Sequence, residues 1–465
     1  MLTVSTLNRI LTAVPDYKVF HTVAEMDENS RKLAAEYPDL VSIFEIGKTS
    51  KGYPINCLKI GFGSKNALLM GCPHPNEPIG AMMLEYFTKA LIEDEALREE
   101  MDLTWYIIKS WDADGTMLNE GWFKGPFTLY HYARNFYRPP GKLQVDWTFP
   151  IDHKELHFHA TIPETEAVMH LIEDIRPIFI YTLHNAGFGG VYFYISRPAE
   201  EIYEGLRATA AKQHVPLNLG EPEAPYLRAY SPAIYQGMGI SETYDYYEKY
   251  GVEHPEILCD TGTSSSDFAA KHCNAFTLLT ELPYFYDKRV EDLSASDMIR
   301  KDAVLENLDT SEKANKFIMS TLETVKDWIS SENPFKRTLD AFLLYEKGND
   351  ATRKMVNENP EYAKISTVAE KFDNLLISRF YKMLSFGLLI RANEYELQIM
   401  NEISLVDVKR QGAFAHALEI SEAELKAQCA YLEEQIHYEV VPIQKLVRIQ
   451  LESGLITADY VRRNA

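Results

Sequence analysis

The sequence predicts an α/β protein with an additional C-terminal helical region. Over about the first 290 of the 465 residues, short apolar runs alternate with Gly, Pro, Asn and Asp, and some of these runs are followed by apolar residues at helical spacing. After about residue 300 the turn residues become rare, and the apolar positions follow a helical period. We therefore expect two domains, an α/β domain over residues 1–300 and a helical extension over residues 301–465.

Strands are predicted where runs are short, apolar and rich in β-branched and aromatic residues. These runs are residues 67–71, 103–111, 177–184, 190–196 and 274–285. The first of them leads into a turn that contains three prolines, and a helical pattern follows over residues 79–94. Such a strand, turn and helix is the arrangement in which α/β proteins place their sites, at the ends of strands.

In the C-terminal region the apolar residues form a stripe along a predicted helix. The stripe consists of Ala314, Phe317, Ile318, Leu322, Val325, Trp328 and Ile329. Two pairs, Asp309 with Glu312 and Ser421 with Glu424, have the spacing of a capping box and predict that helices start there. The region is therefore expected to be a helical bundle.

The charge balance excludes a typical nucleic-acid-binding protein. There are 47 Lys and Arg against 68 Asp and Glu, which gives 47 − 68 = −21, whereas a nucleic-acid backbone requires clustered cations. No apolar run approaches the ~18 residues that a membrane helix needs. Five cysteines without a C-x-x-C pair indicate neither a disulfide framework nor a structural zinc cluster. We expect a cytoplasmic protein that binds neither nucleic acid nor membrane.

The segment GCPHPNEPIG, residues 71–80, contains the sharpest local motif. It places His74 and Glu77 three residues apart, in the turn that leaves a buried strand and enters a helix. An imidazole nitrogen and a carboxylate oxygen are both good zinc ligands. This pair alone is a weak signal, because such a tetrapeptide often occurs by chance in a polar loop.

Two distant residues strengthen the metal hypothesis. His184 ends the predicted strand 177–184, where a third ligand would lie at the end of a strand; a catalytic zinc needs three protein ligands and one open position. Glu281 lies in an otherwise apolar strand, where a carboxylate is costly unless it is paired, metal-adjacent or solvent-facing. Such a carboxylate suits a general base that takes a proton from water and returns it to a leaving nitrogen.

Several motifs, taken in order, resemble the M14 zinc metallocarboxypeptidase family over most of the first 290 residues. They are the strand-turn-strand pattern of residues 37–61, the turn with His74 and Glu77, DADGT at 112–116, ARNF at 133–136, His184, and the segment 261–285. DADGT is similar to the family's Asn-Pro-Asp-Gly segment and ARNF to its Asn-Arg-Asn-Phe. In the last segment Glu281 follows Asp267 by 14 positions, as in the family pattern.

The resemblance implies a fold, a cofactor and residue roles. The fold would be a mixed twisted sheet flanked by helices. One zinc ion would be bound by His74, Glu77 and His184. Glu281 would be the general base, and Arg134 would hold a substrate carboxylate through a bidentate, charge-assisted pair.

The sequence departs from the family pattern beside that arginine. Ala133 stands where the family has Asn, and between Gly115 and Arg134 the only basic residue before His131 is Lys124, so no arginine is available there to stabilise an oxyanion. Arg138, slightly further along the chain, is the alternative.

Ser266 occupies the position at which the family sets its side-chain preference. Its small hydroxyl offers neither an opposite charge for a basic side chain nor an apolar floor for a bulky one. This argues against the two standard digestive specificities and leaves small, polar or unusual acyl groups open. The alternative interpretation is a serine that caps a local turn.

The sequence therefore predicts a zinc-dependent metallocarboxypeptidase that hydrolyses the amide bond of a peptide or peptide-like substrate bearing a free carboxylate. A first alternative is a zinc-dependent N-acyl amino acid deacylase on the same fold, which Ala133 and the missing arginine favour. A second is a non-catalytic, zinc-stabilised interaction protein. The C-terminal helices are a candidate surface for a homo-oligomer.

Overall fold

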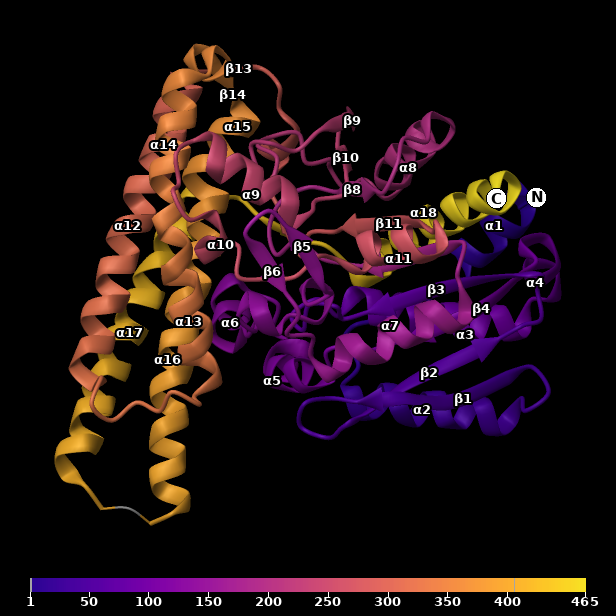
Figure 1. The fold of residues 1–465 in the computed structure, drawn as a ribbon, viewed down its shortest axis with the longest axis horizontal. Helices are drawn as coiled ribbons and strands as arrows, with labels where there is room; N and C mark the ends of the chain where they lie inside the picture. Colours follow the sequence, from indigo (N-terminus) through magenta and orange to yellow (C-terminus); the bar gives the residue numbers. More distant parts are fainter. Residues whose placement is uncertain (1, 405) are drawn as a thin grey trace.

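The computed structural model describes residues 2–404 and 406–465. A mixed sheet of nine strands lies at its centre, in the order β1-β2-β4-β3-β7-β11-β8-β10-β9 (Figure 1). The strands are β1 (Val41–Lys48), β2 (Pro54–Ile60), β3 (Lys65–Gly71), β4 (Leu103–Ile108), β7 (Phe179–Leu183), β8 (Tyr192–Ile195), β9 (Ala229–Ser231), β10 (Ile234–Gln236) and β11 (Phe276–Glu281). Strands β4, β3, β7 and β11 are parallel, and antiparallel pairs flank them on both sides.

Both faces of the sheet are covered by helices, as the apolar strand sequences require. In β3, Ala67 and Leu69 belong to one apolar cluster, and Leu68 and Met70 belong to another on the opposite face. The first face packs against α3 (Ile79–Glu93), α8 (Glu200–Gln213) and α18 (Ile443–Asn464). The second packs against α7 (Pro163–Ile175) and α11 (Ser265–Cys273).

The helical extension stands beside the sheet as a stack of long helices (Figure 1). Its main members are α12 (Arg300–Val325), α13 (Pro334–Tyr345), α16 (Ser378–Glu402) and α17 (Val408–Gln435). After α17 the chain returns to the sheet, where α18 packs against β7 and β11. The side chain of Gln450 on α18 donates a hydrogen bond to the carbonyl oxygen of His184, which follows β7, at 3.1 Å. The C-terminal part of the chain therefore contributes both a separate stack and a cover of the sheet.

The remaining elements connect these layers. The helices are α1 (Val4–Thr12), α2 (Val23–Glu36), α4 (Glu95–Met101), α5 (Ala113–Phe123), α6 (Leu129–Asn135), α9 (Ile240–Lys249), α10 (Pro255–Leu258), α14 (Asn349–Glu358) and α15 (Val368–Phe372), with a π-helical turn, η6 (Asp373–Ile377), before α16. The short strands are β5 (Ile151–His153), β6 (Leu156–Phe158), β12 (Phe285–Tyr286), β13 (Ala295–Ile299), β14 (Ile365–Thr367) and β15 (Glu439–Val440). Among the helices of the described residues, none combines the length and the apolar character that crossing a bilayer requires.

The extension is attached to the α/β part through α6 and α5. Arg391 of α16 donates hydrogen bonds to the carbonyl oxygens of Leu118, Asn135 and Phe136, at 2.7 to 3.1 Å. Asn135 is the last residue of α6 and Phe136 is its C-cap, and carbonyl groups at a helix end need such partners. Leu118 lies in the middle of α5. The guanidinium of one partly buried arginine therefore binds the end of α6 and the middle of α5, and fixes α16 against both.

The predicted fold class is confirmed, including the mixed sheet and the additional C-terminal helices. The two predicted helix starts are wrong. Asp309 lies inside α12, and Ser421 lies inside α17, where its hydroxyl donates to the carbonyl oxygen of Ala417. Residues at capping-box spacing also occur inside long helices. There a serine hydroxyl can donate to the carbonyl oxygen of the preceding turn, as Ser421 does.

Candidate metal centre and active site

Three neighbouring parallel strands carry the predicted site residues at their carboxyl ends. The turn after β3 bears His74 and Glu77, His184 directly follows β7, and Glu281 is the last residue of β11. Gly71 of β3 pairs in register with Leu183 of β7, so the residues that follow these two strands meet at one edge of the sheet. The parallel arrangement thus brings together side chains that are up to 207 positions apart in the sequence (281 − 74 = 207).

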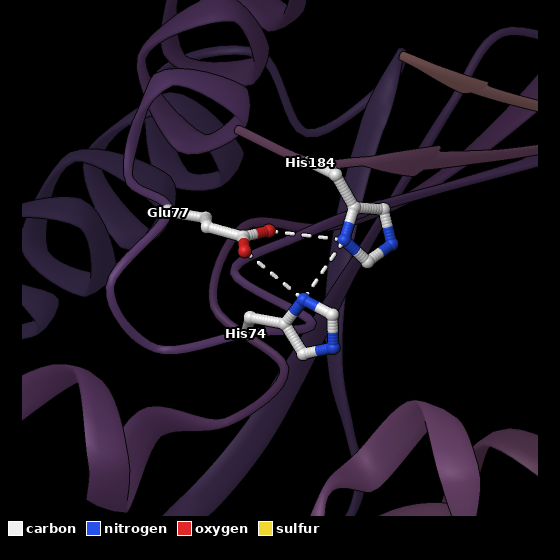
Figure 2. A group of neighbouring side chains, drawn as sticks. All are labelled: His74, Glu77 and His184. Carbon is white, nitrogen blue, oxygen red and sulfur yellow. Dashed lines mark hydrogen bonds and ion pairs between the residues drawn. The ribbon is translucent and has the colours of Figure 1, made fainter. Parts of the chain in front are cut away.

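His74, Glu77 and His184 converge on one point (Figure 2). Nδ1 of His74 lies 3.0 Å from Oε1 of Glu77, and Nδ1 of His184 lies 2.9 Å from Oε2 of the same carboxylate. The two Nδ1 atoms are 3.0 Å apart. All three residues are buried, and the ligand atoms lie within 4.8 Å of one another.

This donor set fits a zinc ion. Two imidazole nitrogens and one carboxylate oxygen are the ligands of an open, catalytic zinc site. Two imidazole nitrogens that face each other at 3.0 Å need a positive charge or a proton between their lone pairs. Burial and the charge of Arg138 lower the pKa of His74 to about 4, so this ring is neutral at pH 7 and has a lone pair that can bind a metal.

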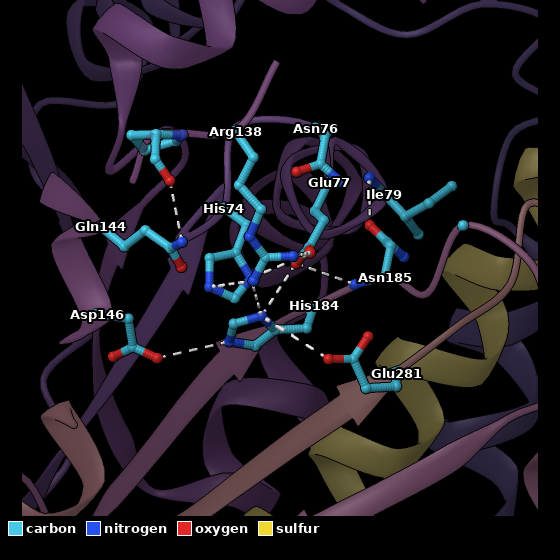
Figure 3. A network of polar contacts seen from close by, with 12 residues as sticks. His74, Asn76, Glu77, Ile79, Arg138, Gln144, Asp146, His184, Asn185 and Glu281 are labelled. Atoms are coloured by element: carbon cyan, nitrogen blue, oxygen red, sulfur yellow. Dashed lines mark hydrogen bonds and ion pairs between the residues drawn. The ribbon is translucent and has the colours of Figure 1, made fainter. Parts of the chain in front are cut away.

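Asp146, which the sequence analysis did not single out, lies behind the third ligand. Its Oδ2 is 3.6 Å from Nε2 of His184 (Figure 3). Its Oδ1 accepts a 2.5 Å hydrogen bond from the hydroxyl of Ser265. A carboxylate behind a metal-binding histidine fixes the orientation of the ring and raises its basicity. No local motif announces this role, because Asp146 lies 38 positions before His184 (184 − 146 = 38).

Arg138 is the arginine that reaches the centre (Figure 3). Its Nη2 lies 2.8 Å from each ring nitrogen of His74, and its Nη1 lies 3.5 Å from Oε1 of Glu77. Asn185 supports the same carboxylate, because its backbone N–H donates to Oε2 of Glu77 at 3.2 Å. This guanidinium places a positive charge beside two of the three ligands.

The two carboxylates of the centre differ electrostatically. Burial would raise the pKa of Glu77, but the charge of His74 and the hydrogen bonds from both histidines lower it below its ordinary value. The pKa of Glu281 is raised well above its usual range by burial and by the charge of Glu77. Oε1 of Glu281 lies 4.0 Å from Nδ1 of His184. Glu77 is therefore a carboxylate anion that can bind a metal ion, whereas Glu281 holds a proton more tightly, as an acid–base group does.

Arg134 is not brought to this centre, which corrects the role implied for it. Its Nε donates to Glu422 of α17 at 2.8 Å, and its Nη2 is paired with Glu394 of α16. It is absent from the described residues that line the cavity. Because α6 packs against the extension, the side chain points toward the acidic residues of those helices rather than toward a substrate.

A cavity of about 460 Å³ opens over the centre. Ser266, in the first turn of α11, lies in its wall, as do Glu281 and Arg138. The helical extension supplies the opposite part of the wall, with residues Asp373, Ile377, Ser378, Tyr381 and Leu384. The extension therefore contributes to the wall of the cavity.

The hydroxyl of Tyr381 ties this wall to the loop that follows His184. It accepts a hydrogen bond from the N–H of Gly187 and donates one to the carbonyl oxygen of Phe188, both at 3.1 Å. The extension and the loop that carries the third ligand are thus held together.

One known protein family matches more than half of the chain. The zinc carboxypeptidase family model, Peptidase M14, matches residues 26–288, which is more than half of the chain. Among solved structures, the chain is similar to carboxypeptidase A from Helicoverpa armigera, with 15% identity over 60% of this chain and 71% of the other and a TM-score of 0.36. A Shewanella amazonensis protein described as a metallopeptidase has 15% sequence identity over 56% of this chain and 85% of the other, with a TM-score of 0.37. The structure of bovine thrombin-activatable fibrinolysis inhibitor has 14% sequence identity over 57% of this chain and 86% of the other, with a TM-score of 0.33.

A search of curated proteins finds no match. The family model covers the turn with His74 and Glu77, His184 and the strand that ends at Glu281, so it spans the whole centre described above. The chain belongs to the M14 family of zinc carboxypeptidases.

Proposed function

We propose that this M14 zinc metallohydrolase cleaves the amide bond of a peptide or peptide-like substrate that bears a free carboxylate. One observation carries the proposal: His74, Glu77 and His184 converge beside Glu281 at the floor of one cavity. Three ligands with an open position and an adjacent acid–base group are what metal-assisted hydrolysis requires.

The residues act in a defined order. When bound, zinc polarises the scissile carbonyl and lowers the pKa of water. Glu281 accepts a proton from the attacking water and returns it to the leaving nitrogen, which its raised pKa favours. Arg138 faces the carbonyl oxygen and stabilises the negative charge that develops there.

The substrate carboxylate has a suitable partner in the first turn of α11. Ser266 lies in the cavity wall there, and a helix N-terminus presents free N–H groups and a positive end of the helix dipole. We assign the carboxylate to this turn, because Arg134 is bound to the extension.

The test is hydrolysis of N-blocked peptides with free C-termini by the zinc-loaded protein. Wild-type protein should cleave them, and a chelator should abolish cleavage. Glu281→Gln should retain zinc and lose turnover by about three orders of magnitude or more, whereas His184→Ala should lose zinc itself. Full activity of Glu281→Gln, or unchanged zinc content of His184→Ala by elemental analysis, contradicts the proposal.

The N-acyl amino acid deacylase remains the second candidate, and the position of Arg134 favours it. Arg138 is the only arginine in the described cavity wall. If it stabilises the carbonyl oxygen, no second guanidinium of this wall is left to bind the substrate carboxylate. A panel of N-acyl amino acids assayed beside the C-terminally free peptides shows which bond is cut. Chelator-sensitive hydrolysis of either class excludes the non-catalytic interaction protein.

Two further properties are proposals of the same kind. The long helices of the extension are a candidate homo-oligomer surface, which light scattering of the purified protein tests. A cytoplasmic location agrees with the cysteines, all five of which are free thiols. Localisation of a fluorescently tagged protein tests it.

A further inference from the structure

The cavity over the metal centre is rich in carboxyl groups. Besides the two histidines and the tyrosines, its acidic and basic side chains are one arginine, Arg138, and six carboxyl groups, namely Glu77, Asp146, Glu221, Glu223, Glu281 and Asp373. Glu77, Asp146 and Glu281 belong to the centre itself. Glu221 is neutralised by Arg300, whose Nε and Nη2 donate to its two oxygens at 2.9 and 2.5 Å. Glu223 and Asp373 remain, and within the described part of the chain neither has a cationic partner.

The carboxylate of Glu223 is held in place by two tyrosines of β8. The hydroxyl of Tyr194 donates to one of its oxygens at 3.0 Å, and the hydroxyl of Tyr192 donates to the other. Tyr192 pairs in register with Glu281 on the neighbouring strand, so the fixed carboxylate lies on the wall next to the proposed general base. Neutral donors of this kind orient a carboxylate while leaving its charge uncompensated.

Asp373 completes this wall from the helical extension. Its Oδ2 accepts a 2.6 Å hydrogen bond from the backbone N–H of Glu221. Its Oδ1 is buried and has no hydrogen-bond partner among the described residues. Burial raises the pKa of Asp373 well above its usual range, and a cation bound beside it would favour the charged form. A buried carboxylate oxygen without a donor is costly, and the cost falls when a ligand supplies the donor. The space for this carboxylate depends on Gly220, because a Cβ there would lie 1.9 Å from Oδ2 of Asp373.

We propose that Glu223 and Asp373 bind a positively charged group of the substrate, a guanidinium or an ammonium. That the bound cation belongs to a substrate rests on the proposed hydrolase function. Binding of the cation itself can be measured without turnover. A substrate whose carboxylate lies at the first turn of α11 and whose positive group lies at this wall matches the polar groups of the cavity at both places. The extension therefore contributes to specificity through Asp373.

The experiment compares Nα-acetyl-arginine with its neutral isostere Nα-acetyl-citrulline by titration calorimetry on the zinc-loaded full chain. Both compounds carry the same carboxylate and differ in the charge of the side chain. We expect the wild-type protein to bind the arginine compound about tenfold or more tightly, as charged hydrogen bonds typically provide. In Glu223→Gln and in Asp373→Asn this preference should shrink at least threefold.

A matched control is Glu204→Gln, since Glu204 is an exposed carboxylate of α8 outside the cavity wall. It removes the same charge and should keep the full preference for the arginine compound. Thermal unfolding of each variant identifies any that fails to fold, and the other cavity variant then decides. Equal binding of the two compounds by wild type, no binding of the arginine compound, or an unchanged preference in both cavity variants overturns the proposal. Absence of hydrolysis with retained preference overturns only the proposed function.

Discussion

Gly387 of α16 lies directly against the carbonyl oxygen of Ala133 on α6: a Cβ on Gly387 would be 1.8 Å from that oxygen. The contact is between two backbones, so no side-chain rotation can relieve it. It fixes the distance between the helical extension and the part of the chain that carries the metal ligands. The position of the cavity wall formed by the extension depends on this close approach.

The first prediction is that Gly387→Ala destabilises the protein. Forcing the two helices apart should lower the free energy of unfolding by about 1–3 kcal/mol, the typical cost of overpacking. Gly412→Ala is the matched control, because no heavy atom of the described residues lies within 4 Å of the Cβ it adds to α17. It should be neutral or stabilising by up to about 1 kcal/mol. Denaturant unfolding measures both, and equal midpoints would contradict the contact.

The second prediction concerns Asp146. Asp146→Asn should keep the fold but lower zinc affinity about 10–100-fold, because the negative charge behind His184 is lost. Competition with a chromophoric chelator gives the affinity. An affinity equal to that of wild type would show that the 3.6 Å contact does not support the ligand.

The third prediction separates the two arginines. Arg138→Ala should reduce kcat by about 100-fold or more with zinc retained, if the guanidinium beside His74 and Glu77 stabilises the oxyanion as proposed. Arg134→Ala should lower stability by about 1 kcal/mol through loss of its pairs with Glu394 and Glu422, with little effect on KM. Steady-state kinetics and unfolding curves of both variants test this. A large rise in KM for Arg134→Ala would restore the role that the sequence resemblance implies.

The fourth prediction concerns the pH dependence of stability. Burial raises the pKa of Asp112 from 3.8 to about 7, and the charges of Glu164 and Asp114 add to this shift. A carboxyl group with a raised pKa in the folded state contributes stability that is fully present below about pH 4 and is lost as the pH rises through about 7. Asp112→Asn stays neutral and keeps an N-cap side chain for α5.

The Asp112→Asn variant should therefore equal wild type near pH 4 and become more stable than wild type as the pH approaches 8. The difference should reach at most about 4 kcal/mol, which corresponds to roughly three pKa units. Urea unfolding at several pH values measures it. A difference that does not change with pH would show that Asp112 is already ionised at low pH in the folded protein.

Much of the site was predictable because its residues carry local signals. His184 and Glu281 are polar side chains at the ends of apolar strands, and the parallel order of β3, β7 and β11 brings them to the turn with His74. The fold class followed from periodicity in the same way. These features depend on strands and turns, whose patterns are short and regular.

The role of Arg134 and the composition of the cavity wall were not predictable in this way. Arg134 is paired with carboxylates 260 and 288 positions further along the chain, and nothing in its own segment identifies them. Asp373 reaches the cavity from a π-helical turn of the extension, at a place where the sequence shows only a helical pattern. Contacts between remote helices depend on their packing, which local periodicity does not encode.

The return of α18 to the sheet has a consequence for biosynthesis. Residues 443–464 leave the ribosome only after residues 301–442, yet they cover the face of the sheet beneath the strands that bear the ligands. Until then Tyr181, whose hydroxyl donates to the carbonyl oxygen of Gln450, and its apolar neighbours remain exposed to water. We therefore expect a fragment ending near residue 300, which lacks α18, to expose this apolar face and to precipitate rather than fold.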